Sequence, residues 1–168
     1  MPETEMAHND LNARNILVVA AGGHPAPVVI DWARLGSAIA YTDYARIEAD
    51  ATVEVVERVL SDEYAPGPRE VGIALRMFEE HLYGLGRAQV IDIPASWGPF
   101  VDAARAIVKA VRSTLPKRRS GRDVATYTLV LGLTYLSYLR RPYWDRLSTR
   151  TRAFACYLAM RCFERAVT

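Results

Sequence analysis

The stretch that decides the fold runs from residue 15 to residue 31 and reads Asn15-Ile16-Leu17-Val18-Val19-Ala20-Ala21-Gly22-Gly23-His24-Pro25-Ala26-Pro27-Val28-Val29-Ile30-Asp31. Two runs rich in β-branched residues, 16–20 and 28–30, flank a glycine-containing loop, and this pattern predicts a β-hairpin. In an antiparallel hairpin, the residue that enters the first strand faces the residue that leaves the second. We therefore expect Asn15 and Asp31 to lie side by side, about 5 Å apart, where an amide oxygen and a carboxylate can share one Mg²⁺.

The residues before the hairpin add further polar side chains. They read His8-Asn9-Asp10-Leu11-Asn12-Ala13-Arg14-Asn15, which places Asp10 on the loop that leads to the open end of the hairpin. Together with Asp31, this stretch resembles the catalytic core of the protein kinase superfamily. The signature of that superfamily pairs a histidine and an aspartate with an asparagine five residues after the aspartate, followed by a metal-binding aspartate after a hairpin. His8, Asp10, Asn15 and Asp31 match this signature.

The closer resemblance is to the small-molecule branch, the aminoglycoside phosphotransferase and choline kinase-like proteins. Asp43 follows Asp31 by only twelve residues, whereas protein kinases insert a longer activation segment there. Residues 10–17 and 43–50 are also similar to a bacterial phosphotransferase-like group, the ternary-complex-associated domain. Asn9 stands where the small-molecule kinases usually have glycine. Asparagine tolerates such a tight turn better than most residues, because it adopts left-handed backbone conformations.

The resemblance implies a role for each matching residue. Asp10 would act as the catalytic base on an acceptor hydroxyl, while Asn15 and Asp31 would bind a magnesium ion together with ATP. His8 would support the catalytic loop, and Asp43 would accept hydrogen bonds from the backbone N–H groups of that loop. Each residue also has a structural alternative. Asp10 could be a turn residue, Asn15 part of an Asx turn, Asp31 the cap of the following turn, and Asp43 a helix N-cap.

One part of the kinase fold has no counterpart in the sequence. The family places a nucleotide-binding lobe before the catalytic loop, with a glycine-rich loop over the phosphates and a lysine that contacts them. Only seven residues precede His8. We therefore expect a C-terminal lobe that binds ATP and Mg²⁺ only if the missing lobe is supplied, either by a partner or by a longer chain. The alternative function is a non-catalytic protein-interaction module of a bacterial signalling or defence assembly, and the sequence does not identify a phosphate acceptor.

The remainder of the chain predicts a mainly α fold of the α+β class, in one domain over residues 1–168. The catalytic loop and the metal-binding hairpin occupy residues 8–36, and a helical subdomain occupies residues 42–168. Apolar residues at helical spacing, separated by proline and glycine breakers, predict about five helices. We expect these helices at about 43–61, 70–82, 100–115, 124–139 and 149–167, with an irregular loop at 91–99.

Composition and charge restrict the possible settings of the protein. With 51% apolar and 24% charged residues in 168, the chain is typical of one soluble globular domain. The polar N-terminus is unlike a signal peptide, so we expect a cytoplasmic location. Residues 124–139 are uncharged, but the stretch is short and rich in hydroxyl groups, which favours a buried core helix over a membrane span.

Charge is distributed unevenly along the sequence. Residues 112–168 hold 12 of the 21 basic residues and only 3 of the 19 acidic ones. No motif interleaves basic and aromatic residues, so nucleic-acid binding is not favoured. Glu48, Asp50 and Glu54 form an acidic cluster on the first predicted helix. This cluster could face a cationic substrate, but a solvated helix face is the favoured interpretation.

Overall fold

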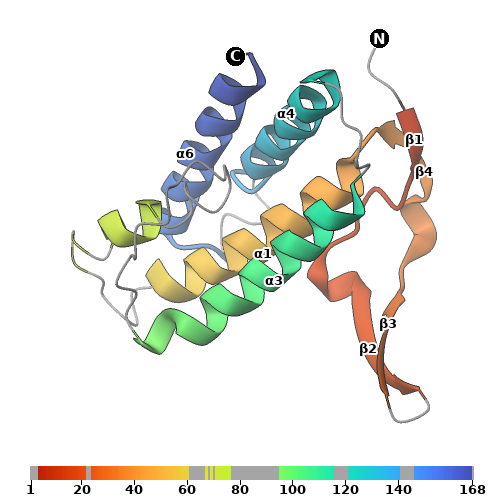
Figure 1. Cartoon of the computed structure of the whole chain (residues 1–168), viewed down its shortest axis with the longest axis horizontal. Helices are drawn as coiled ribbons and strands as arrows, with labels where there is room; N and C mark the ends of the chain where they lie inside the picture. Colours follow the sequence, from red (N-terminus) through yellow and green to blue (C-terminus); the bar gives the residue numbers. More distant parts are fainter. Residues whose placement is uncertain are drawn as a thin grey trace.

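Two small antiparallel sheets form the N-terminal part of the molecule (Figure 1). The computed structural model describes residues 4–21, 24–60, 67, 69, 71–76, 95–115, 121–140 and 146–167. The predicted hairpin is confirmed as β2 (Ile16–Ala21) paired with β3 (His24–Val29). The expectation of a single hairpin is wrong, because β1 (Thr4–Ala7) pairs with β4 (Gly36–Ile39) in a second sheet. This second pairing brings together the two ends of the segment between residues 8 and 35.

Helices make up most of the described chain after residue 41, so the expected mainly helical fold class is confirmed. They are α1 (Thr42–Leu60), α3 (Gly98–Thr114), α4 (Gly121–Ser137) and α6 (Thr149–Ala166). Short 3-10 turns occur at η1 (Ala13–Asn15), η2 (Trp32–Arg34) and η3 (Ala95–Trp97). All four long helices were predicted to within three residues at each end. The helix predicted at 70–82 is helical at 71–76, and its other residues lie outside the described ranges.

The start of α3 departs from the predicted loop at 91–99. Gly98 and Pro99 belong to the helix, which therefore begins two residues before Phe100. Proline is compatible with the first turn of a helix, because the N–H group that it lacks has no intrahelical partner at that position. Residues 91–94 of the predicted loop lie outside the described ranges.

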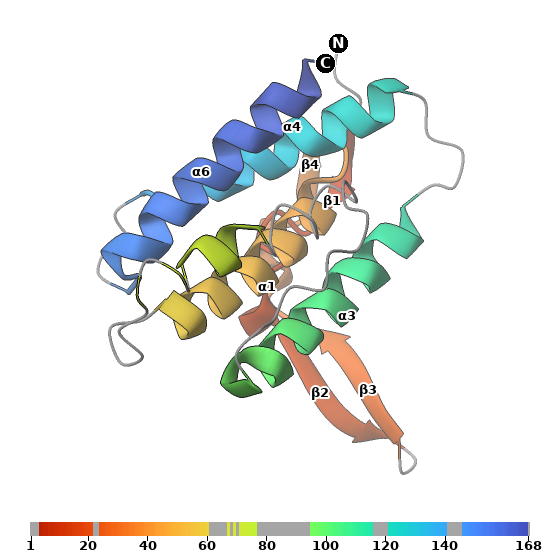
Figure 2. The ribbon, with the colours of Figure 1, turned by 60° about the vertical axis from the view of Figure 1, so that its left-hand side comes forward.

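The hydrophobic core lies where α1 meets α3, α4 and α6 (Figures 1 and 2). Val56 of α1, Tyr135 of α4 and Leu158 of α6 are among its fully buried side chains. Burial of an aliphatic side chain of this size contributes about 1.5–3 kcal/mol. Helices α4 and α6 approach closely at Gly132, where an added Cβ atom would lie 2.7 Å from a ring carbon of Phe163. Glycine is therefore required at that position for close helix packing.

Glu48, from the predicted acidic cluster, is buried in this core with none of its side chain exposed. Arg112 of α3 donates hydrogen bonds to both of its carboxylate oxygens, at 2.6 Å and 3.1 Å, and the Tyr127 hydroxyl of α4 donates a third at 2.6 Å. Burial by itself lowers the pKa of Arg112, but the hydrogen bonds and the negative charge of Glu48 outweigh it and hold that pKa above its ordinary value. The three side chains therefore link α1 to α3 and α4.

The other two residues of the cluster differ from each other. Asp50 accepts a hydrogen bond from the Tyr138 hydroxyl, so it also faces the protein. Glu54 is exposed and pairs with Arg58 on the same helix. The interpretation of the cluster as a solvated face is therefore wrong for Glu48 and Asp50, and it holds for Glu54.

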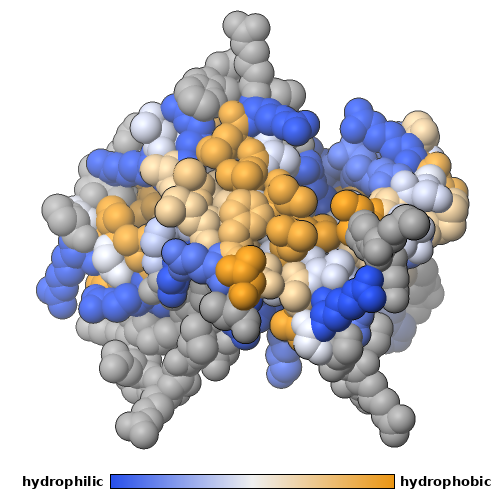
Figure 3. Space-filling model, turned by 90° about the horizontal axis from the view of Figure 1, so that it is seen from above, coloured by the Kyte–Doolittle hydropathy of each residue, from blue (hydrophilic) through white to orange (hydrophobic). Residues whose placement is uncertain are grey.

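The uncharged stretch 124–139 falls mostly within α4, which buries Tyr127, Leu131 and Tyr135. On the opposite side of the helix, Leu129 and Leu133 are exposed. The view from above, where α4 and α6 lie, shows an apolar patch on that face of the molecule (Figure 3). Across the described ranges, no helix has the length and apolarity needed to span a bilayer.

Candidate functional site

The Asp43 carboxylate fixes the start of the loop between β1 and β2. One oxygen accepts a hydrogen bond from the backbone N–H of His8 at 2.6 Å, and the other accepts one from the N–H of Asn9 at 3.1 Å. Both bonds connect residues that lie more than thirty positions apart in the sequence. Asp43, at the start of α1, thus makes the contacts with the loop backbone that the kinase resemblance implies.

The His8 ring joins this loop to the end of β3. Its side chain is buried, and its Nε2 atom lies 2.8 Å from the carbonyl oxygen of Ile30. A carbonyl only accepts hydrogen bonds, so Nε2 carries the proton. The other ring nitrogen, Nδ1, is buried without a hydrogen-bond partner in the described part of the chain, and the ring packs against Trp32 with centroids 4.9 Å apart. The His8 ring is therefore anchored between the loop and the end of β3.

Asn9 ties the loop to the segment after the hairpin. Its backbone is left-handed, with φ of 63°, and its side-chain amide donates to the carbonyl of Arg34 at 2.9 Å. Asparagine adopts this left-handed conformation more readily than most residues other than glycine. Residues 8–9 and 30–34 are thus held together by side-chain contacts from His8 and Asn9.

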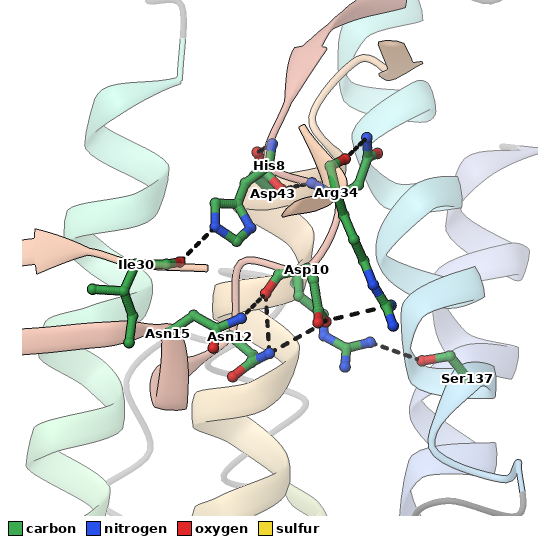
Figure 4. A network of polar contacts seen from close by, with 10 residues as sticks. His8, Asp10, Asn12, Asn15, Ile30, Arg34, Asp43 and Ser137 are labelled. Atoms are coloured by element: carbon green, nitrogen blue, oxygen red, sulfur yellow. Dashed lines mark hydrogen bonds and ion pairs between the residues drawn. The ribbon is translucent and has the colours of Figure 1, made fainter. Parts of the chain in front are cut away.

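Asp10 lies at the centre of the polar network (Figure 4). Its backbone carbonyl accepts hydrogen bonds from the side-chain amides of Asn12, at 3.0 Å, and Asn15, at 2.8 Å. Its carboxylate accepts a longer bond from the Asn12 amide, at 3.3 Å, and forms an ion pair with Arg34 at 3.7 Å. A quarter of the Asp10 side chain remains exposed. The backbone is therefore fixed from two sides while the carboxylate stays accessible.

The hairpin register differs by one residue from the expected one. Ile16 pairs with Val29, and the carbonyl of Asn15 accepts a hydrogen bond from the N–H of Ile30. Asn15 therefore faces Ile30, and the prediction that it directly faces Asp31 is wrong. The register is set by the pair nearest the turn, in which Ala21 faces His24. Asp31 is the first residue after the facing pair Asn15–Ile30.

Asp31 leaves the strand in a left-handed conformation, with φ of 60° and ψ of 57°. Such a backbone is uncommon for a residue other than glycine and is typical of sites where surrounding contacts impose it. The residue precedes η2, but its side chain makes no capping hydrogen bond. The structural alternative of Asp31 as a turn cap therefore has no contact to support it.

Two oxygen donors of the site are available for a cation. The side-chain amide nitrogen of Asn15 donates to Asp10, which leaves the amide oxygen of Asn15 unused. Neither this oxygen nor the Asp31 carboxylate accepts a hydrogen bond from another described residue. Amide and carboxylate oxygens are ligands that suit Mg²⁺, an ion usually held by one or two protein groups together with phosphates and water. The described residues contain no cluster of three or more His, Cys, Asp or Glu side chains that could enclose a metal. The chemical type of these two oxygens therefore suits an ion that takes most of its ligands from a bound phosphate and water.

Three contributors to the site were not predicted from the sequence. The Asn12 side chain and the Arg34 guanidinium both contact Asp10. The Asn9 side chain contacts the backbone carbonyl of Arg34. The spacing of Asn12 two residues after Asp10 is a local signal for a side-chain contact with the backbone. No sequence pattern signals the contact of Arg34 with Asp10, because the two residues lie 24 positions apart.

Comparisons of the chain with models of known protein families, with curated proteins and with solved structures found no match. The kinase-like interpretation therefore depends on the residues and contacts described above.

Proposed function

We propose that this chain is a phosphotransferase-like domain, equivalent to the C-terminal lobe of ATP- and Mg²⁺-dependent kinases that act on small-molecule hydroxyls. The observation that carries the proposal is the fixation of one loop, residues 8–15, against one segment, residues 30–34. His8 and Asn9 supply the hydrogen bonds that join them, and Asp43 fixes the start of the loop to the first turn of α1. This arrangement holds the backbone of Asp10 and leaves its carboxylate open to a ligand.

Asp10 is the residue proposed to receive the proton of the acceptor hydroxyl. General base catalysis of this kind contributes roughly 10²–10⁴ in rate. The neighbouring Arg34 guanidinium is largely exposed and offsets the negative charge of Asp10. The amides of Asn12 and Asn15 hold the main chain of Asp10, which limits the directions in which its carboxylate can point.

Asn15 and Asp31 are the residues proposed to hold Mg²⁺. The ion would supply positive charge against the oxygens of the transferred phosphate, which is the main form of stabilisation in phosphoryl transfer. Asp31 is suited to this role because its carboxylate is exposed, and Asn15 because its amide nitrogen is already used by Asp10 and its oxygen is not.

The domain alone should bind nucleotide weakly and transfer no phosphate at a useful rate. Phosphoryl transfer depends on positioning and charge stabilisation, and the residues above include neither a phosphate-covering glycine-rich loop nor its lysine. Isothermal titration with Mg·ATP tests this expectation. A low-micromolar dissociation constant that is lost on Asp31→Ala substitution would show instead that this domain contains a complete nucleotide site.

The metal and nucleotide positions can be tested by paramagnetic broadening. Titration of ¹⁵N-labelled protein with Mn·ATP should broaden the amide signals of residues 10–15 and 30–34 before others. Asn15→Ala and Asp31→Ala should weaken that effect severalfold, whereas Asp102→Ala, which removes an exposed carboxylate on α3, should not change it. Broadening that is spread over the surface, or that persists in both site variants, would contradict the proposed metal site.

One observation favours the alternative function, a non-catalytic interaction module. Met6 precedes the loop in sequence, and Trp32 and Leu35 lie in or beside the segment 30–34; they are 67%, 54% and 52% exposed, respectively. Exposed large apolar side chains of this kind mark interaction sites when they occur together. The same surface would serve a nucleotide-binding lobe supplied by a partner or by a longer chain. The Mn·ATP titration separates the two, because an interaction module without nucleotide chemistry should show no localised broadening at residues 10–15.

A further inference from the structure

The β2–β3 hairpin projects from the helical body, and both of its long edges extend away from it (Figures 1 and 2). The hydrogen bond from Ile30 N–H to Asn15 carbonyl defines which residues exchange bonds within the hairpin. Because bonded and non-bonded pairs alternate, the pairs Leu17–Val28 and Val19–Ala26 are bonded. The backbone groups of residues 16, 18 and 20 therefore point outward from β2, and those of residues 25, 27 and 29 point outward from β3.

The outer edge of β3 is closed to further strand pairing. Pro25 and Pro27 occupy two of its three outward positions, and proline has no N–H to donate. At the third position, the carbonyl of Val29 already accepts a hydrogen bond from the Trp32 indole at 3.1 Å. Proline at outward positions is one of the ways in which natural sheets prevent edge-to-edge association.

The outer edge of β2 has none of these protections. Ile16, Val18 and Ala20 carry both N–H and C=O groups at its outward positions, and within the described chain no backbone hydrogen bond reaches them from outside the hairpin. Their side chains are uncharged. With His24 neutral, every residue from 15 to 30 is also uncharged. Val18, at the middle of the edge, is 71% exposed. An isolated two-stranded hairpin is marginally stable in water, so an added strand would also stabilise it.

We propose that β2 is a dimerisation strand, which pairs antiparallel with β2 of a second copy of this chain about a two-fold axis at Val18. The outward groups are self-complementary in this register. Val18 faces Val18 of the second copy, and Ile16 faces Ala20 of the second copy, so every outward N–H meets an outward carbonyl. An isologous pairing of this kind is the usual form of a homodimer interface.

The closed edge of β3 determines the size of the assembly. In the dimer the strand order is β3-β2 of one copy followed by β2-β3 of the other, which leaves a proline-containing edge on each outer side. A further chain finds too few donors there to pair. The structure therefore favours a closed dimer over an open fibre, despite the apolar character of the hairpin.

The test is a pair of opposite charge substitutions at the proposed two-fold axis. In analytical ultracentrifugation, the apparent mass of the wild-type chain should rise with protein concentration from 18.8 kDa toward twice that value. Val18→Lys and Val18→Glu should each raise the dissociation constant by about two- to fivefold, because like charges directly opposite in a sheet are destabilising. An equimolar mixture of the two variants should restore the dimer, since lysine then faces glutamate. Val28→Lys is the matched control, because it adds a charge to the same hairpin away from the β2 edge and should leave the dimer intact.

Circular dichroism of each variant shows whether it has folded, and the exposure of Val18 predicts that all of them do. A wild-type chain that stays monomeric up to its solubility limit would overturn the proposal. So would a dimer that both single variants retain, a mixture that fails to reassociate, or wild-type assemblies that grow beyond two copies.

Discussion

Asp43→Ala substitution should destabilise the protein by about 2–4 kcal/mol. The carboxylate accepts two backbone hydrogen bonds, from the buried His8 at 2.6 Å and from the exposed Asn9 at 3.1 Å. A hydrogen bond to a charged group contributes about 1.5–3 kcal/mol, and we place the His8 bond in that range and the Asn9 bond below it because water competes there. Loss of a negative charge in the first turn of α1 adds about 0.3–1 kcal/mol.

The measurement is urea-induced unfolding followed by circular dichroism, combined with hydrogen exchange at the amides of His8 and Asn9. Both amides should exchange faster in the variant, because they lose their acceptor. Asp43→Asn keeps one acceptor oxygen and should cost about half as much as Asp43→Ala. Asp102→Ala removes an exposed carboxylate near the start of α3 and should change stability by no more than about 0.5 kcal/mol.

Two results would refute this reasoning. One is an Asp43→Ala variant with the same unfolding free energy as the Asp102→Ala control. The other is unchanged exchange at His8 and Asn9 despite a loss of stability, because the effect would then arise in α1 and not in the loop.

Three further predictions concern the helical core. Glu48→Ala should cost about 3–5 kcal/mol in urea unfolding, because it leaves the charge of Arg112 without its buried partner; a cost below about 1 kcal/mol would contradict that role. Gly132→Ala should lower stability by about 1–3 kcal/mol, since the added methyl group overlaps the ring of Phe163, and a gain in stability would show that α4 and α6 can separate at no cost. Burial, and then the charge of Glu48, raises the pKa of Tyr135, so the folded state keeps the hydroxyl proton at a pH where the unfolded state loses it. The contribution of the Tyr135 hydroxyl to the free energy of unfolding is fully present below about pH 10. Above that pH the free energy of unfolding falls by up to about 1.4 kcal/mol per pH unit. Tyr135→Phe should reduce that slope, and an unchanged slope would mean that other groups cause it.

Much of the local structure could be predicted from the sequence, because its signals lie within a few residues of one another. The glycine loop between β-branched runs predicted the β2–β3 hairpin, and apolar spacing between breakers predicted α1, α3, α4 and α6. Proline at position 99 shows the limit of such signals. The breaker pattern places it in a loop, although proline is also compatible with a helical first turn, and local sequence does not distinguish the two.

The arrangement of the site was decided by contacts between distant residues. The β1–β4 sheet has no turn of its own, and the register of β2 against β3 moved the residue opposite Asn15 from Asp31 to Ile30. Arg34 reaches Asp10 only because the chain between them folds back on itself as the hairpin.

The same reason explains the acidic cluster. Sequence alone determined that Glu48 lies on a helix with acidic neighbours, and a charged residue on a helix is by default expected to face water. Only the packing of α3 and α4 against α1 provided Arg112 and Tyr127 as partners, from 64 and 79 positions away in the chain. Burial of a carboxylate depends on such partners, so helical periodicity predicted the element and tertiary structure decided which of its faces became the core.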